Sequence, residues 1–173
     1  MLSASFAFAL LTHSIGEPVQ DRYTRNFLPA GRQAPDFALT SLNGRTVGLK
    51  SSRDNFKATV LIFWTLGGDS SLPLIQSINA MRERVRSDLR VIAINHADEL
   101  EKVKAAWSTN DIKFPCVMNK VAENDVSRSY GVVGYPSVYV LDSDEKVVAA
   151  FYQPTADNVM SSLASLGIAL PTR

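Results

Sequence analysis

The chain has 173 residues, 46% of them hydrophobic, which suits one globular domain with a sizeable core. Eighteen Lys and Arg against 17 Asp and Glu leave a formal net charge of +1, so no overall field favours nucleic acid or an anionic membrane. The only cysteine is Cys116, which excludes an intramolecular disulfide and a cysteine-rich zinc site. With two histidines in the whole chain, we expect no metal and no cofactor.

Residues 1–30 show no sustained hydrophobic period and are predicted to form an N-terminal tail or a remnant signal segment, followed by one domain at 31–170. The apolar run from Phe6 to Leu11 is too short to span a bilayer. It matches a signal peptide only in part, because no Lys or Arg precedes it and no clear small-x-small cleavage site follows. We expect no membrane contact beyond such a segment.

The first half of the domain predicts a hairpin, a buried strand and a helix. Two apolar-rich runs, 37–41 and 46–49, flank Asn43-Gly44, a strong short-range hairpin signal. The run 58–65 is continuously β-branched or apolar, which predicts a strand buried on both faces. From Ser71 to Val85 apolar residues recur every three or four positions, the period of an amphipathic helix.

The second half continues the alternation of strands and helices. A strand is predicted at 89–95, then a helix from about Asp98 that carries Leu100, Val103 and Trp107 on one face. The remaining elements are a short strand at 113–118, a helix within 122–132 ended by Gly131, strands at 135–142 and 146–152, and a helix stopped by Gly167. This order predicts an α/β fold with a central mixed β-sheet, helices on both faces and an N-terminal β-hairpin.

Several local motifs, taken in this order, resemble the thioredoxin-fold redoxin group, in its AhpC/TSA and TlpA-like branch of thiol-disulfide exchange and peroxide reduction. The resemblance covers Ala34 to Leu166 and rests on "APDFALTSLNGRTVGL", "VLIFWT", "VIAIN", "FPCVMN" and "SRSYGVVGYPSVYVLD". It implies a thioredoxin-like fold. It also implies an extracytoplasmic location, periplasmic or secreted.

The active-site cysteines of that group are missing from this chain. In the group a Cys-x-x-Cys follows the "FW" strand, and alignment on "SINAM" puts that motif on Gly68-Asp69-Ser70-Ser71. The acids that members carry near it fall at Ile62 and Leu74, and the peroxiredoxin motif Pro-x-x-x-Thr/Ser-x-x-Cys is absent. The resemblance therefore implies a degenerate centre that cannot carry out dithiol–disulfide exchange.

The motif "GYPSVY" matches the loop in which the group places a cis-proline opposite the active-site turn, so Pro136 is the candidate for a cis peptide bond. In the group this loop offers its backbone to an extended substrate segment. We therefore expect the chain to bind a protein or extended peptide. The predicted binding residues are Trp64, Gly68, Asp69, Ser70, Ser71, Tyr135 and Pro136.

The turn before the long helix has three other interpretations, namely a capped turn, an anion pocket and a serine nucleophile. Asp69 or Ser70 suits the cap of a helix that Pro73 helps to start, and we favour such a capped turn over an anion pocket at the helix N-terminus. A Ser71 nucleophile with His96 as its base is disfavoured, because nothing here resembles a nucleophile elbow.

Cys116 supplies the main alternative, a monothiol thiol-disulfide oxidoreductase or peroxidase-like enzyme. A buried cysteine behaves as a small hydrophobic residue, whereas a reactive one needs a nearby cation or helix N-terminus. Lys113 and Lys120 keep the enzyme open as an alternative, although we favour a structural thiol. A purely structural subunit is the third alternative and predicts a large exposed apolar patch.

Overall fold

The computed structural model describes residues 19–51, 56–120 and 125–168. The apolar run from Phe6 to Leu11 and the start of the predicted helix at 122–132 lie outside the described residues.

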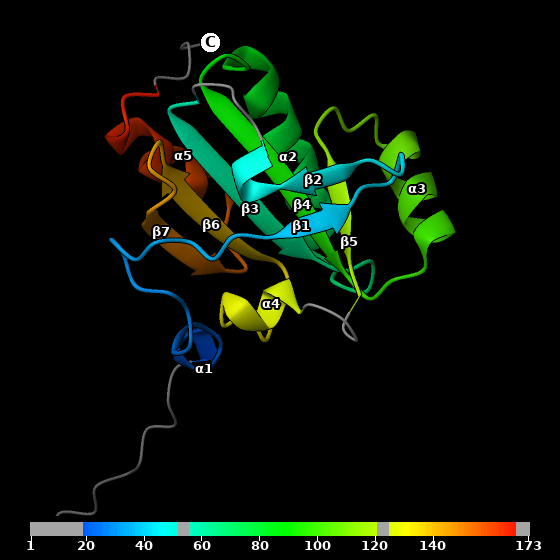
Figure 1. The fold of residues 1–173 in the computed structure, drawn as a ribbon, viewed down its shortest axis with the longest axis horizontal. Coiled ribbons are helices and arrows are strands. Elements are labelled where there is room, and N and C mark those ends of the chain that lie inside the picture. The colour runs from blue at the N-terminus through cyan, green and yellow to red at the C-terminus, as the bar shows by residue number, and fades with distance from the viewer. Residues whose placement is uncertain (1–18, 52–55, 121–124, 169–173) are drawn as a thin grey trace, which may run out of the picture.

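A five-stranded mixed sheet forms the centre of the fold, in the order β5-β4-β3-β6-β7 (Figure 1). Its strands are β3 (Ala58–Trp64), β4 (Leu89–His96), β5 (Cys116–Asn119), β6 (Ser137–Asp142) and β7 (Val147–Tyr152). β4 runs parallel to β3 and β5, whereas β6 is antiparallel to β3 and β7. Every residue of β3 is buried, as its unbroken apolar run predicts for a central strand.

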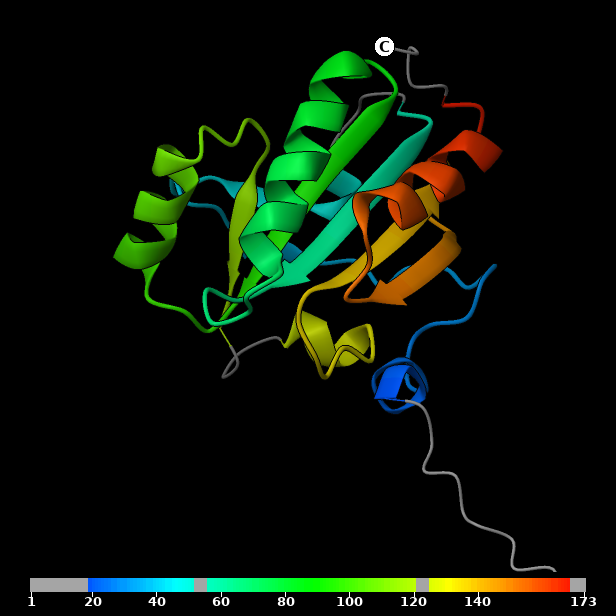
Figure 2. The ribbon, with the colours of Figure 1, turned by 180° about the vertical axis from the view of Figure 1, so that it is seen from behind.

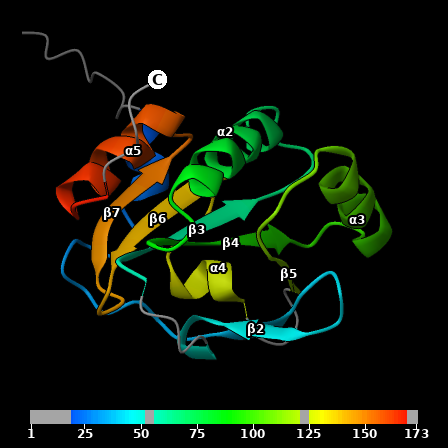
Figure 3. The ribbon, with the colours of Figure 1, turned by 90° about the horizontal axis from the view of Figure 1, so that it is seen from above.

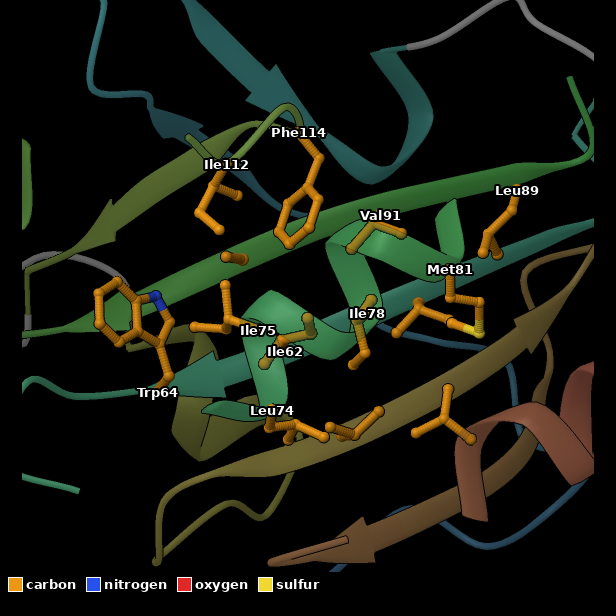
Figure 4. Packing of buried hydrophobic residues seen from close by; sticks show 14 of the residues in the cluster. Ile62, Trp64, Leu74, Ile75, Ile78, Met81, Leu89, Val91, Ile112 and Phe114 are labelled. Atoms are coloured by element: carbon orange, nitrogen blue, oxygen red, sulfur yellow. The ribbon is translucent and has the colours of Figure 1, made fainter. Parts of the chain in front are cut away.

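Three helices pack on one side of this sheet. They are α2 (Ser71–Arg84), α3 (Leu100–Thr109) and α5 (Ala156–Ser165). Figure 2 shows α2 and α5 lying across the sheet, with α3 beside β5. Ile62 and Trp64 of β3 face this layer and share a core with Ile75 and Ile78 of α2 (Figure 4). The period of three to four residues from Ser71 onward is therefore the buried stripe of α2.

The opposite face is covered by shorter elements (Figure 3). They are the hairpin of β1 (Ala38–Thr40) and β2 (Thr46–Gly48), the 3₁₀ helix η1 (Leu49–Ser51) and α4 (Val126–Ser129). Phe63 and Ile94 point into this second core. The hairpin predicted around Asn43-Gly44 is confirmed, with Gly44 at φ +81°, a backbone angle that glycine adopts without strain.

Part of the predicted N-terminal tail packs against the sheet. Helix α1 (Val19–Thr24) lies beside the end of β7, where the Tyr23 ring stacks on the Tyr152 ring with centroids 4.1 Å apart. The backbone N–H of Leu28 donates a hydrogen bond of 2.9 Å to the Tyr139 hydroxyl. These contacts join residues more than 100 positions apart, which explains why no local period announces them.

Two details of the predicted helices are settled by the structure. Gly131 and Gly167 have φ values of +68° and +75°, the left-handed geometry expected just after a helix. Val103 and Trp107 of α3 are buried as predicted, but Leu100 is 40% exposed. Leu100 lies in the first turn of α3 and lines a surface hollow.

Candidate functional site

The candidate site lies at one edge of the sheet, where β3 and β4 end and β6 begins. Phe63 pairs with Ser137 across the antiparallel β3–β6 ladder, so the turn after Trp64 emerges next to Pro136. β4 is parallel to β3 and ends at the same edge, with Asn95 opposite Trp64. The sheet therefore brings together the turn, the loop after β4 and the proline loop, which is where ligands bind in many open α/β sheets.

The turn runs directly into α2 without a side-chain cap. The N–H of Ser71 donates to the Gly68 carbonyl at 2.9 Å, and the N–H of Leu74 donates to the Ser70 carbonyl at 3.2 Å. Ser70 occupies the cap position with φ −88° and ψ −5°, and its side chain makes no capping hydrogen bond. The predicted capped turn is therefore wrong, because Ser70 has near-helical angles and not the extended ones of a capping serine.

Gly68 and Ser71 occupy the two positions that align with the missing cysteines. A Cβ atom added to Gly68 would lie 3.7 Å from the Cβ of Ser71 and 2.6 Å from its Oγ. Cβ atoms joined by a disulfide are about 3.5–4.5 Å apart. Ser71 is fully buried, and its Oγ has no hydrogen-bond partner among the described residues. Asp69 and Ser70, between the two positions, are exposed.

Asp98 ties the loop after β4 to the turn. Its Oδ2 accepts hydrogen bonds from the backbone N–H of Leu66 at 2.7 Å and from Nδ2 of Asn95 at 2.8 Å. The N–H of Asp98 in turn donates to Oδ1 of Asn95 at 3.2 Å. Sequence analysis missed this residue. A polar residue just after a buried strand, at the carboxyl edge of a parallel pair, was the available signal.

The proline loop forms the other side of the site. The Tyr135–Pro136 peptide bond is cis. The Ser137 hydroxyl donates to the Gly134 carbonyl at 2.7 Å, and the N–H of Gln153 donates to the Pro136 carbonyl at 2.8 Å. Val133 is 58% exposed, whereas Pro136 is buried and Tyr135 half-buried. The loop thus exposes the Val133 side chain and part of Tyr135 to solvent.

His96 packs against the proline loop, and its described contacts do not include Ser71. Its ring stacks on the Tyr135 ring with centroids 5.0 Å apart. Its Nδ1 lies 3.4 Å from both Asn119 Nδ2 and the Ser127 Oγ, at the start of α4. Burial raises the pKa of the Tyr135 hydroxyl. The pairing of Ser71 with His96 that a hydrolase would need is therefore not formed.

Trp64 lies beneath the turn and offers no surface to a partner. It is fully buried, and its indole packs on Trp107 with ring centroids 5.5 Å apart. Figure 4 shows it at the end of β3, within the core. Of the residues predicted to bind, Trp64 therefore contributes to the support of the turn and not to its exposed face.

Cys116 lies level with Ile62 in the sheet, because it pairs with Ala93, which pairs with Ile62. Ile62 is two residues before Trp64, the last residue of β3. The cysteine is 2% exposed, and burial raises the pKa of its thiol to about 12. The prediction of a structural thiol is supported, since almost none of this group is thiolate at neutral pH.

Within residues 19–51, 56–120 and 125–168, no three His, Cys, Asp or Glu side chains gather closely enough to hold a metal ion. No helix in those ranges is both long and apolar enough to cross a membrane.

A mixed sheet, a turn entering a long helix, and a facing cis-proline define a protein of the thioredoxin-like class. The solved thiol-disulfide oxidoreductase of Bacteroides fragilis superposes with a TM-score of 0.68 at 16% identity, covering 78% of this chain and 99% of that one. The chain belongs to the AhpC/TSA family, whose model matches residues 30–150.

Two curated relatives agree with this assignment. The thioredoxin-like protein YneN of Bacillus subtilis is 30% identical over 115 residues, 65% of each chain. The thiol-disulfide oxidoreductase ResA of Bacillus thuringiensis is 31% identical over 123 residues, 68% of this chain and 66% of the relative. The match thus spans just under two thirds of the length of these relatives.

Proposed function

We propose that this thioredoxin-like domain does not perform dithiol–disulfide exchange and acts by binding an extended peptide or partner protein. The binding surface would run across the turn from Gly68 to Ser71 and the Tyr135–Pro136 loop. By analogy with the family, we also propose an extracytoplasmic location. Cell fractionation with an antibody to the chain tests that location directly.

One observation carries the proposal: the turn retains the backbone spacing of a dithiol centre while holding no sulfur. The added Cβ of Gly68 and the Cβ of Ser71 are at disulfide distance, yet the residues are glycine and serine. Exchange proceeds by attack of a thiolate on a disulfide sulfur. Without a thiol at either position, the turn has no group for this reaction.

The surface around the turn supports a binding role. Gly67, Asp69 and Ser70 are exposed on one side, and Val133 is 58% exposed on the loop opposite. Both segments leave the sheet at adjacent strands, so one extended chain can contact both. Recognition of this kind uses backbone hydrogen bonds for affinity and side-chain contacts for specificity.

The Cys116 enzyme receives no such support. A monothiol mechanism needs an accessible thiolate, whereas this thiol is 2% exposed with its pKa raised to about 12. Burial outweighs the hydrogen bonds with Trp64 and Asn95, which lower the pKa of this thiol.

Two measurements test the proposal together. In an insulin-reduction assay with dithiothreitol, the protein should not accelerate the reaction. In a ¹⁵N NMR titration with reduced, carboxymethylated insulin B chain, an extended peptide, shifts should concentrate at the amides of residues 67–71 and 131–135. Shifts confined to other surfaces would overturn the binding site, and catalysis of insulin reduction would overturn the redox inactivity.

A matched pair of variants sharpens the titration. Val133 is 58% exposed on the proline loop, and Ala164 is exposed on α5, outside both proposed surfaces. Val133→Asp should weaken peptide binding about tenfold, the effect of losing one partly buried apolar contact. Ala164→Asp should leave the affinity for this peptide unchanged.

A further inference from the structure

A continuous surface groove lies between the N-terminal hairpin and α3. Its main hollow, of about 640 Å³, is lined by β1, the loop after β4, the first half of α3 and the end of β5. Two more hollows, of about 450 and 320 Å³, continue it around the hairpin turn towards Phe114, and Leu42 and Asn43 line all three. We call this surface the hairpin groove. Figures 1 and 3 show the hairpin turn beside α3.

The floor of the hairpin groove is apolar. Leu42 and Met118 are half-buried there and pack against the core below. Leu100 of α3 lies at the wall and is 40% exposed. Trp107 lines the two smaller hollows, with its indole N–H donating to the Phe114 carbonyl at 3.0 Å. A contiguous apolar surface with a polar rim, more than a single exposed leucine, is typical of an interaction site.

The rim of the hairpin groove is basic. Its lining includes four cationic side chains, namely Arg45, Lys104, Lys113 and Lys120, and two carboxylates, Asp98 and Asp111. Asp111 pairs with Lys113, and Lys104 pairs with the exposed Glu101, whereas Asp98 accepts only from uncharged N–H groups of Leu66 and Asn95 among its described partners. With four cations against two carboxylates, the described lining carries two more positive than negative charges.

We propose that the hairpin groove binds a segment of a partner protein in which acidic side chains flank apolar ones. The apolar residues would lie over Leu42, Met118 and Leu100, while the acids would meet the cations of the rim. Three hollows in a row suit an extended segment better than a compact small molecule. This surface is separate from the peptide site proposed above, and the two approach each other at Asp98.

The test uses three synthetic peptides with the same leucines and with Glu, Gln or Lys between them. The indole N–H signals of the two tryptophans provide the readout in ¹⁵N NMR. Trp107 lines the groove and should shift more on addition of the Glu peptide than the fully buried Trp64, which packs behind it. The Gln peptide should bind more weakly, and the Lys peptide should leave Trp107 unchanged.

Charge reversal supplies the decisive comparison. Lys104→Glu with Lys120→Glu should weaken binding of the Glu peptide about threefold to tenfold, the effect of two exposed charge pairs. The same double variant should bind the Lys peptide more tightly than the wild type does, which also shows that it is folded. Lys102→Glu, on the same helix but outside the groove lining, should bind the Glu peptide like the wild type.

Several outcomes would overturn the proposal. Equal binding of the Glu and Lys peptides would show that charge does not select the partner. An unchanged Trp107 signal would show that the peptides do not bind in the hairpin groove. Self-association on sedimentation that the Lys104 and Lys120 changes abolish would make a second copy the occupant. Flotation with phosphatidylglycerol vesicles, without peptide binding, would make a lipid surface the occupant. The insulin B-chain titration reads the amides of residues 67–71 and 131–135, so the two proposals fail independently.

Discussion

The ring of Tyr23 lies so close to Gly134 that a Cβ atom on this glycine would come within 2.5 Å of it. The same atom would lie 2.6 Å from the Tyr152 ring, on which Tyr23 stacks. Helix α1 therefore contacts the loop that leads into Pro136, at the same sheet edge as the turn. Only a residue without a side chain allows this approach.

Gly134→Ala should separate α1 from the proline loop. Because the new methyl group meets two rings, we expect a loss of stability of about 1–3 kcal/mol, measured by urea unfolding, and loss of NMR cross-peaks between Tyr23 and Tyr152. Gly67→Ala is the matched control, since a Cβ at Gly67 would meet nothing within 4 Å. Intact cross-peaks and unchanged stability in Gly134→Ala would contradict this account of the contact.

Gly68→Cys combined with Ser71→Cys should form a disulfide in mild oxidant, because the two Cβ atoms would be 3.7 Å apart. After denaturation, alkylation should label only Cys116 in the oxidised variant, and all three thiols after reduction. The control is Gly67→Cys with Ser71→Cys, whose first Cβ would reach nothing within 4 Å. If the control forms its disulfide as readily as the first pair, the turn does not favour a disulfide between positions 68 and 71.

Asp98→Ala should destabilise the protein by about 1–3 kcal/mol, because it leaves two donors, Leu66 N and Asn95 Nδ2, without their acceptor. The amide of Leu66 should exchange its hydrogen faster in the variant. Asp88→Ala removes a carboxylate whose partner among the described residues is the exposed Lys57, and it should cost about 0–1 kcal/mol. Equal unfolding free energies for the two variants would refute the role of Asp98 in holding the turn.

Much of the fold could be predicted because its determinants are local. Asn43-Gly44 sets the hairpin, the apolar run at 58–64 sets the central strand, and Gly131 and Gly167 end helices at left-handed angles. These features depend on backbone preferences and on periodicity within about ten residues, which a sequence displays directly.

The details of the site depend on contacts between distant segments, which local patterns do not display. Asp98 reaches Leu66 across 32 positions, and Tyr23 reaches Tyr152 from the predicted tail. The backbone angles of Ser70 are set by the way the turn enters α2. Serine is favoured at helix caps, yet at these angles its side chain makes no capping hydrogen bond. Leu100 follows the apolar period of α3 yet is 40% exposed, because it lies at the wall of a surface groove.

The burial of Cys116 makes the stability of the protein sensitive to alkaline pH. Burial raises its pKa from an ordinary 9.0 to about 12 in the folded chain. Above pH 9 the unfolded chain releases this proton and the folded chain keeps it, so stability falls as pH rises towards 12. The slope contributed by one such group is about 1.4 kcal/mol per pH unit.

Cys116→Val should flatten this fall, which urea unfolding at pH 8, 9 and 10 measures. Buried tyrosines add a similar loss at higher pH, because burial also raises the pKa values of Tyr130 and Tyr139, so the range below pH 10 isolates the cysteine best. In the wild type, iodoacetamide should alkylate the folded thiol far more slowly than the unfolded one, with no inflection below about pH 8. Fast alkylation with an inflection below about pH 7 would instead reveal an activated thiolate and restore the monothiol enzyme as the leading function.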